Sequence, residues 1–174
     1  MPEAPAEERV ILVDENDVET GTAEKLHAHR QRLLHRAVSV FVLDTRGTVL
    51  LQRRAAGKYH SGGLWSNTCC SHPRPGEPVE AAATRRLREE MGLECPLRHA
   101  FTFTYAATLD GGLHEHEYDH VFVGTTDADP RPDPIEVSEW RRVSLTDLRR
   151  DLAAHPERYV AWFARVLAGL SVER

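Results

Sequence analysis

Short stretches of alternating or β-branched apolar residues recur along the chain, and each of them predicts a β-strand. These stretches are residues 9–13, 37–43, 48–52, 101–106, 115–123 and 136–143. A turn at residues 44–47 separates the second stretch from the third, and this arrangement predicts a hairpin. Residues 23–32 are polar and rich in His, and their pattern does not specify a conformation.

Three other segments predict helices. Residues 78–91 begin with a proline, place apolar side chains on one stripe and end before Gly92. Ser144 and Asp147 match a capping box that opens a second helix, and residues 156–170 predict an amphipathic terminal helix. Strands and helices in this mixed order favour an α+β fold, an α/β/α sandwich with a mixed sheet, over a doubly wound parallel array.

The length of 174 residues predicts one domain that buries its own core. Residues 1–8 are rich in Pro, Ala and Glu, which indicates a flexible tail before a domain of residues 9–174. The tail lacks the basic and apolar regions of a signal peptide, and no run approaches the ~20 apolar residues of a membrane helix. We therefore expect no membrane association.

Charge and cysteine content exclude several classes of protein. The chain has 22 basic and 27 acidic residues, which argues against a general nucleic-acid binder or a basic protein of membrane surfaces. Its three cysteines do not make a disulfide framework and suit a reducing compartment. We expect a cytoplasmic protein that acts on a small molecule, and the sequence does not determine its oligomeric state.

Residues 59–75 are loop-like, with several glycines and prolines, yet they also carry Cys69, Cys70 and His72. Reactive side chains on a loop indicate a functional site. Free cysteines are also commonly buried as small apolar residues, and a Cys-x-His pair occurs in structural zinc sites. From these residues alone both interpretations stay open for Cys69 and Cys70, and packing is the usual role of a free cysteine.

Two carboxylates share one face of the predicted strand at residues 115–123. The strand period of two points Glu115 and Glu117 the same way, and two like charges side by side require a reason. His116 lies between them and points to the opposite face, so we interpret it as a structural or surface residue.

The segment from Ser71 to Leu93 resembles a Nudix box, a loop-helix-loop whose helix carboxylates surround a divalent cation that bridges a diphosphate. The matching residues are Ser71, Glu77, Arg85, Arg86, Leu87, Glu89, Glu90, Gly92 and Leu93. Mg²⁺ binds through one or two carboxylates and phosphate oxygens, so Glu90 is a candidate ligand. Ser71 replaces the leading Gly of the box, and Arg86 replaces its first acidic residue. That arginine removes a carboxylate that a hydrolase needs and adds a cation for phosphate, so we expect diphosphate binding without cleavage.

A wider pattern resembles type I isopentenyl diphosphate isomerase, a family with the Nudix fold. The pattern comprises residues 21–25, 35–42 and 52–58, and above all residues 65–73, which read Trp-Ser-Asn-Thr-Cys-Cys-Ser-His-Pro. The resemblance spans roughly residues 10–170. It implies an isomerase of isoprenoid biosynthesis that interconverts isopentenyl diphosphate and dimethylallyl diphosphate through a tertiary carbocation.

The resemblance implies that Cys70 and Glu117 are the catalytic proton carriers on opposite faces of the substrate, with Tyr105 assisting Glu117. Moving a double bond requires one protonation and one deprotonation, and the cation between these steps must be shielded from water. Aromatic faces stabilise a cation, and the resemblance implies Tyr105 and Trp162 around it, with Trp65 a further candidate. Tyr105 and Trp162 also sit on apolar stripes, so plain core packing stays open for both.

The same resemblance implies a metal centre of three His and two Glu. The ligands would be His29, His35, His72, Glu115 and Glu117. Imidazole with carboxylate suits Zn²⁺ or Mn²⁺, as a second divalent ion besides the Mg²⁺ that accompanies the diphosphate. The spacing from His29 to His35 leaves His27 open as the alternative first ligand.

Basic residues from separate segments are candidates for binding the diphosphate. By position in the resemblance these are Lys25, Arg54, Lys58 and Arg86, with Arg53 and Arg85 as less certain neighbours. Arg offers bidentate contacts to phosphate oxygens and Lys a point charge. Simple solvent exposure is the alternative for each of them.

Two other functions stay open at this point. The first is a Nudix pyrophosphatase for a nucleoside diphosphate derivative, which would share the fold and the cation, and Arg86 argues against it. The second is a zinc-binding interaction module in which Cys70, His72 and nearby His are structural ligands.

Overall fold

The computed structural model describes residues 8–171, so the expected tail lies outside the described residues except for Glu8, as do residues 172–174. The strands are β1 (Arg9–Val13), β2 (Glu19–Glu24), β3 (His35–Leu43), β4 (Val49–Arg54), β5 (Trp65–Ser66), β6 (Cys69–Ser71), β7 (Leu97–Thr108), β8 (His114–Thr125) and β9 (Val137–Val143). The α-helices are α1 (Lys25–Arg30), α2 (Val79–Met91), α3 (Leu145–Ala154) and α4 (Phe163–Ser171), with 3-10 turns at Asp110–Gly112 and Pro156–Arg158. Within residues 8–171, no helix is long and apolar enough to cross a membrane.

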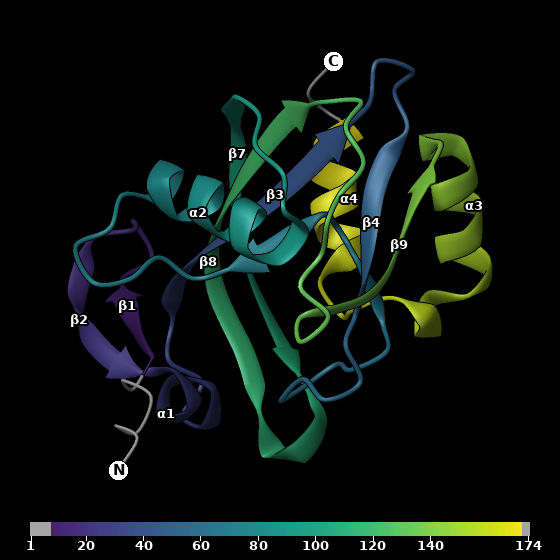
Figure 1. The fold of residues 1–174 in the computed structure, drawn as a ribbon. Coiled ribbons are helices and arrows are strands. Elements are labelled where there is room, and N and C mark those ends of the chain that lie inside the picture. Colours follow the sequence, from purple (N-terminus) through teal and green to yellow (C-terminus); the bar gives the residue numbers. More distant parts are fainter. Residues whose placement is uncertain (1–7, 172–174) are drawn as a thin grey trace, which may run out of the picture.

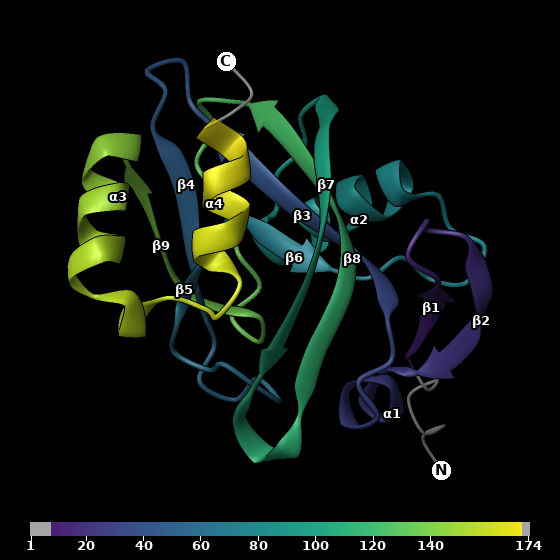
Figure 2. The ribbon, with the colours of Figure 1, turned by 180° about the vertical axis from the view of Figure 1, so that it is seen from behind.

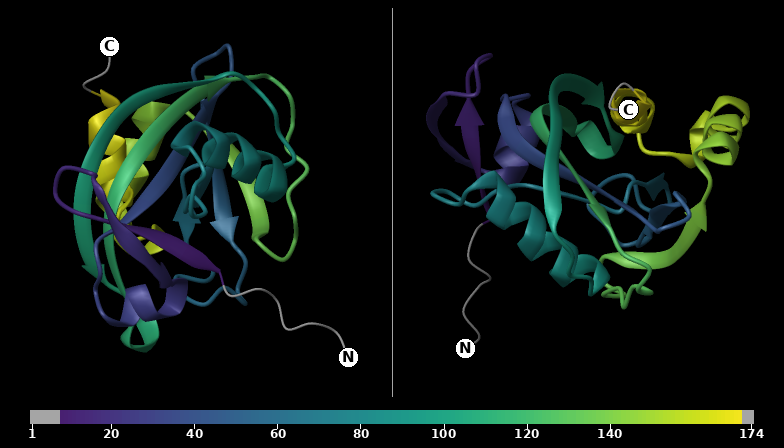
Figure 3. Two further views of the ribbon diagram at one scale, coloured as in Figure 1. Left: turned by 90° about the vertical axis from the view of Figure 1, so that its left-hand side faces the viewer. Right: turned by 90° about the horizontal axis from the view of Figure 1, so that it is seen from above.

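A mixed sheet lies between α2 and α4, so the predicted α+β fold with α/β/α layers is confirmed (Figure 1, Figure 2). Seen from above, the two helices cover opposite faces of the strands (Figure 3). The central strand β3 pairs in parallel with β8 and antiparallel with β1. Because both of its faces are covered, β3 reads as a nearly continuous apolar run.

Side chains of β3 alternate between two cores. Val38, Val40 and Val42 belong to the cluster that α2 covers, whereas Phe41 belongs to the cluster of α4. This strand period of two also decides which way β6 points its cysteines. Cys69 is fully buried in the cluster under α2, as expected for a packing residue.

Local signals for helix ends were predictive. Pro78 stands at the N-cap of α2, and Gly92 ends that helix in the left-handed conformation, with φ 62°. A Cβ at Gly92 would lie 2.5 Å from the carbonyl oxygen of Arg131, so the position also requires a residue without a side chain. Ser144 caps α3 as the capping box predicts, because its hydroxyl accepts a hydrogen bond from the N–H of Asp147 at 3.1 Å.

The predicted hairpin of residues 37–43 and 48–52 pairs only beside its turn, at Leu43 and Val49. Beyond that point the two strands separate, and residues 65–71, here called the insert, lie between them. Within the insert, β5 pairs with β4 and β6 pairs with β3. The loop predicted over residues 59–75 therefore contains two short strands, which its glycines and prolines did not indicate.

Buried hydrogen bonds of the insert connect the two separated strands. The Thr68 hydroxyl accepts from the N–H of Val42 at 2.8 Å and donates to the carbonyl of Leu50 at 2.6 Å. The Asn67 amide donates to the carbonyl of Val40 at 3.1 Å. Since these polar atoms are out of reach of water, losing a partner would leave backbone groups unpaired at full desolvation cost.

Two further segments differ from the sequence-based expectation. The helix predicted over residues 156–170 begins only at Phe163, because Tyr159 forms a β-bridge with Trp65 of the insert. Trp162 therefore precedes the helix. Strand β2 was not predicted, because Glu19–Glu24 has no apolar alternation and pairs only with β1 at the edge of the sheet.

Thr68→Val keeps the volume of the side chain and removes both hydrogen bonds of the hydroxyl. We expect the free energy of unfolding to fall by about 2–4 kcal/mol, because a buried N–H and a buried carbonyl lose their partners. Urea denaturation followed by tryptophan fluorescence measures this change. The control is Thr104→Val on the exposed side of β7, which is expected to change stability by less than about 0.5 kcal/mol. Equal stability of the two variants would contradict the bridging role of Thr68.

Candidate active site

Five side chains from four parts of the chain converge on one point. They are His29, His35, His72, Glu115 and Glu117, whose ligand atoms all lie within 4.8 Å of one another. His29 comes from α1, His35 opens β3, His72 follows the insert, and β8 supplies both carboxylates. The sequence left His27 open as the first ligand, but His27 is exposed whereas His29 is fully buried in the cluster.

Burial along β8 alternates residue by residue, which confirms that Glu115 and Glu117 share one face. His116 is on the opposite face, where its Nδ1 bonds to the carbonyl of Arg32 at 3.0 Å. Asp119 continues the buried face of the carboxylates and is 1% exposed. Three acidic residues thus line one side of a single buried strand.

Backbone carbonyls fix the tautomers of two of the imidazoles. Nδ1 of His29 donates to the carbonyl of Lys25 at 2.7 Å, and Nδ1 of His35 donates to the carbonyl of Leu33 at 2.8 Å. With the proton on Nδ1, each Nε2 presents a lone pair to the cluster. Burial lowers the pKa of His35 to about 4 and holds the pKa of His72 well below its ordinary value, so both are neutral near pH 7.

The ligand atoms at the centre of this cluster lie close together. Nε2 of His35 lies 3.2 Å from Nε2 of His72, which in turn lies 3.3 Å from Oε1 of Glu117. Ligands on one ion with bonds of about 2.0–2.2 Å are separated by about 3.0–3.5 Å, so these spacings fit a shared divalent ion. Oε2 of Glu115 is buried without a hydrogen-bond partner in the described part of the chain, so this oxygen is also suited to bind such an ion. Three imidazoles and two carboxylates form a donor set that suits Zn²⁺ or Mn²⁺.

Burial raises the pKa of Glu117 well above its ordinary value, and the charge of Glu115 acts in the same direction. Without a cation, two buried carboxylates this close cannot both be ionised cheaply. The chain therefore gives Glu117 a strong tendency either to hold a proton or to take a positive partner.

Oxygen atoms that accept hydrogen bonds surround the sulfur of Cys70. Its Sγ donates to Oδ1 of Asn67 at 3.0 Å and lies 3.6 Å from Oγ of Ser39 and 3.7 Å from Oγ of Ser66. The Ser39 hydroxyl donates to Asp119 at 2.6 Å, and the Ser66 hydroxyl donates to Asn67. These two hydroxyl protons are thus used elsewhere, whereas hydrogen bonding by the Trp162 side chain acts to lower the pKa of the thiol.

Burial raises the pKa of the Cys70 thiol to about 11, and the charge of Asp119 acts in the same direction. The thiol therefore carries its proton at neutral pH in the protein without a ligand. A buried, protonated thiol suits a group that gives or receives a proton at a carbon atom.

A narrow chamber of about 30 Å³ brings Cys70 and Glu117 together with the aromatic side chains of Tyr59, Tyr105 and Trp162. Tyr105 lies directly across from Glu117 in the β7 and β8 pairing, and its ring stacks on that of Trp162 with centroids 6.2 Å apart. Trp65 is not part of the chamber lining, and the guanidinium of Arg141 covers its ring. The free volume holds about two water molecules, so little solvent fits between these side chains.

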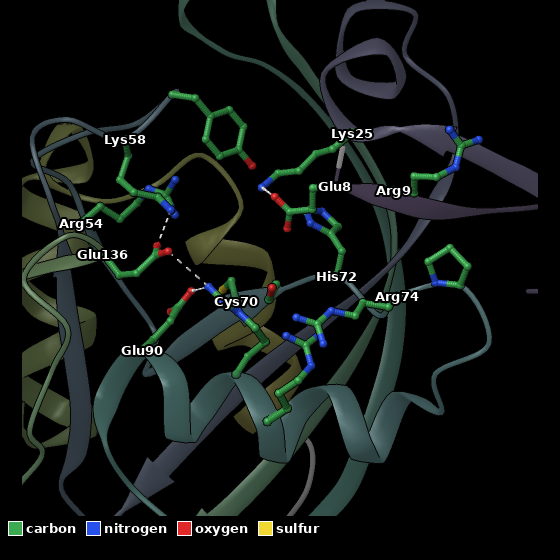
Figure 4. A pocket seen from close by; sticks show the side chains of 15 residues that line it. Glu8, Arg9, Lys25, Arg54, Lys58, Cys70, His72, Arg74, Glu90 and Glu136 are labelled. Atoms are coloured by element: carbon green, nitrogen blue, oxygen red, sulfur yellow. Dashed lines mark hydrogen bonds and ion pairs between the residues drawn. The ribbon is translucent and has the colours of Figure 1, made fainter. Parts of the chain in front are cut away.

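A larger cavity of about 760 Å³ opens beside the chamber, and Cys70 and His72 line both spaces. The cavity receives the basic candidates Lys25, Arg54, Lys58 and Arg86, together with Arg9, Arg74 and Arg85, which come from separate elements (Figure 4). Arg53 does not join them: it is exposed and pairs with Glu139. Adjacent residues of β4 thus point to opposite sides.

Carboxylates hold several of these basic groups in place. Lys58 pairs with Glu136, and Lys25 pairs with Glu8 at 2.9 Å (Figure 4). On α2, Arg86 pairs with Glu89 at 2.7 Å and with Glu90 at 2.5 Å. These partners balance the positive charge of the cavity until an anion enters it.

Glu90 has hydrogen bonds to both of its oxygens. Oε1 accepts from Arg86, and Oε2 accepts from the side-chain amide of Gln52 at 3.0 Å. A cation bound at Glu90 would compete with Arg86 for Oε1, and Arg86 would keep its second partner, Glu89.

Sequence reasoning missed several residues of the site. Asp119 has the strand parity of Glu115 and Glu117, so the period of two could have identified it. His60 stands in the loop among other candidates, 3.1 Å from Glu115, and was not selected. Asn67 lies three residues before Cys70 in the stretch of residues 65–73 but was not selected. Ser39 carries no sequence signal, because only the pairing of β6 with β3 brings it to Cys70.

Comparisons with known proteins agree with this geometry. A NUDIX domain model matches residues 33–163. Two proteins of Aromatoleum aromaticum are similar over most of the chain. "Isopentenyl-diphosphate Delta-isomerase 2" is 55% identical, and the match covers 92% of this chain and 85% of that protein. "Isopentenyl-diphosphate Delta-isomerase 1" is 56% identical, and the match covers 90% of this chain and 88% of that protein. The crystal structure of DR0079 from Deinococcus radiodurans superposes with a TM-score of 0.78 at 22% identity, covering 92% of this chain and 98% of that one, which supports the fold.

His72→Ala removes one of the five converging ligand atoms. We expect its affinity for Zn²⁺ or Mn²⁺ to fall by about 100-fold or more, since even residues that only support a ligand contribute 10–100-fold. Metal content after dialysis against a buffered ion, measured by atomic emission, tests this. His116→Ala on the opposite face of β8 is the control and is expected to retain the ion. Full metal occupancy in His72→Ala would rule out this metal centre.

Proposed function

The chain belongs to the isopentenyl-diphosphate Delta-isomerase family of NUDIX-domain proteins, and from that premise we propose that it interconverts isopentenyl diphosphate and dimethylallyl diphosphate in isoprenoid biosynthesis. The observation that carries this proposal is the narrow chamber in which the thiol of Cys70 and the carboxylate of Glu117 meet. Double-bond transposition needs one proton added to a carbon and another removed from a carbon, so two proton carriers in one narrow chamber suit this reaction.

The substrate would place its diphosphate in the basic cavity and its five-carbon chain in the chamber. Lys25, Arg54, Lys58 and Arg86 are the proposed anion-binding residues, and their charges come from separate elements that face one space. Cys70 lies where the cavity meets the chamber, which is where the carbon chain would begin.

Cys70 and Glu117 are the proposed catalytic residues. One of them gives a proton to the terminal carbon of the double bond, and the other removes a proton from the carbon on the far side of the cationic centre. Tyr105 would support Glu117, its cross-strand partner. After one turnover one group has lost a proton and the other has gained one, so the protein regains its initial state by exchange with solvent.

The chamber lining protects a carbocation from water. Tyr105 and Trp162 are buried, stacked rings, and the negative faces of such rings stabilise a cation. Because the free chamber has room for only about two waters, few water molecules would be able to attack the cation.

Two divalent ions complete the proposal. The cluster of His29, His35, His72, Glu115 and Glu117 would hold Zn²⁺ or Mn²⁺, which would supply positive charge beside Glu117. Mg²⁺ would accompany the diphosphate through Glu90. Arg86, in competition with that ion for Glu90, would contact a phosphate oxygen.

We also propose that residues 9–174 form one domain after a tail of residues 1–8. Its partner would be a small prenyl diphosphate, and neither nucleic acid nor a membrane. All three cysteines are free, which supports a cytoplasmic location because thiols persist in a reducing compartment.

Incubation of the protein with isopentenyl diphosphate and Mg²⁺ in D₂O tests the reaction by NMR. We expect dimethylallyl diphosphate with deuterium in a methyl group. Cys70→Ala is expected to lower kcat by about 10²–10⁴-fold, the usual contribution of a proton-transfer group. Cys95→Ala, at a free cysteine away from the chamber, is the control. Absence of conversion with release of phosphate from other diphosphates would favour a hydrolase instead.

Lys58→Ala tests the anion site. We expect KM to rise about 10-fold or more with a smaller change in kcat, since a hydrogen bond to a charged phosphate contributes about 1.5–3 kcal/mol. Arg53→Ala is the matched control, because Arg53 is nearby on the chain but donates to the Gly63 carbonyl away from the cavity. Steady-state kinetics measures both variants, and an equal KM for the two would argue against Lys58 as a diphosphate ligand.

A further inference from the structure

We infer that His60 is a positioning residue that holds Glu115 in the orientation needed for metal binding and connects the metal centre to the diphosphate site. The inference rests on the proposed function, because it assigns a role to a residue outside the five ligands. His60 lies in the loop between β4 and β5 and is 3% exposed. A buried imidazole at this depth requires partners for both of its nitrogens.

The hydrogen bonds of His60 define its tautomer. Nδ1 lies 2.9 Å from the Ser61 hydroxyl, and Nε2 lies 3.1 Å from Oε1 of Glu115. A carboxylate only accepts, so the Nε2 proton of His60 goes to Glu115 and the Ser61 hydroxyl donates to Nδ1. This is the proton arrangement of an outer imidazole that supports a metal-binding carboxylate.

Both His60 and His29 approach Oε1 of Glu115, and the tautomer of each ring decides which of them donates. His29 also approaches Oε1 of Glu115, at 3.3 Å, but its Nδ1 proton is used by the carbonyl of Lys25. As a neutral ligand His29 therefore has only a lone pair on that side. With Oε1 fixed by His60, the carboxylate keeps its unpartnered oxygen, Oε2, for an ion.

The backbone of the same residue supports the anion site. The His60 carbonyl accepts from Nη2 of Arg54 at 3.1 Å, and Arg54 lines both the basic cavity and the chamber. One loop residue thus holds a proposed diphosphate ligand through its carbonyl and a proposed metal ligand through its ring. Movement of the loop would disturb both sites together.

The loop around His60 is built to keep this position. Ser61 has φ 53°, a left-handed conformation that costs energy for a residue with a side chain. A Cβ at Gly62 would lie 2.7 Å from the Ala56 carbonyl oxygen, so the loop packs closely on itself there. Rings on either side fix the imidazole: Tyr59 at 4.3 Å and Trp162 at 6.0 Å between centroids.

The test measures metal affinity without substrate, so it does not depend on isomerase activity. His60→Ala is expected to weaken binding of Co²⁺, used as a spectroscopic probe, by about 10–100-fold, as for other residues that support a metal ligand. Its visible absorption spectrum should change because Glu115 is no longer oriented. His60→Gln places an amide N–H at a similar distance and should restore most of the affinity and the spectrum.

Thermal melting of each variant separates positioning from folding. A purely structural role would lower the melting temperature of both variants without rescue of metal binding by Gln, and that result would overturn the inference. Unchanged Co²⁺ affinity and spectrum in a folded His60→Ala variant would overturn it equally. If the native protein binds Co²⁺ and His60→Ala binds it weakly, yet neither turns over isopentenyl diphosphate, the positioning role stands and the proposed reaction fails.

Discussion

Buried hydrogen bonds hold residues 65–71 between β3 and β4, and this insertion shapes both the sheet and the site. Thr68 connects the two strands, and Asn67 does so on the side of β3 while it also accepts from the thiol of Cys70. Asn67 therefore both helps to hold the sheet together and orients the reactive sulfur of Cys70. Because a buried polar group without a partner costs much more than a paired one gains, this segment has little freedom to move.

The available hydrogen-bond donors and acceptors also explain which groups of the site carry protons. Around Cys70, each nearby hydroxyl uses its proton elsewhere, so the sulfur keeps its own. At the metal centre, backbone carbonyls take the Nδ1 protons of His29 and His35, so that lone pairs converge with the carboxylates of β8. One region favours a proton and the other favours a cation. The proposed acid-base reaction would use both conditions.

Charge is separated in space as well. The basic cavity beside α2 suits the diphosphate end of the substrate (Figure 4), while Glu115, Glu117 and His60 line the chamber and not this cavity. Arg86 is central to this division, because it occupies a helix position that carries a carboxylate in the Nudix box and now pairs with Glu90. With an arginine at this position, the Nudix scaffold would bind the diphosphate of the substrate while the carbon chain of the substrate reacts.

Local patterns in the sequence were enough for most strands, for the ends of α2 and α3, and for the shared face of Glu115 and Glu117. These features depend on neighbours within one or two turns, where period, proline, glycine and capping residues act directly. The family resemblance added the ligand and proton-carrier candidates but left His27 open beside His29. The terminal helix was predicted too long, because Tyr159 gives up helical geometry to pair with Trp65, a partner far away in the sequence. Ser39 and His60 likewise gain their roles only when separate strands and loops come together, at Cys70 and at Glu115, and local sequence patterns do not contain that information.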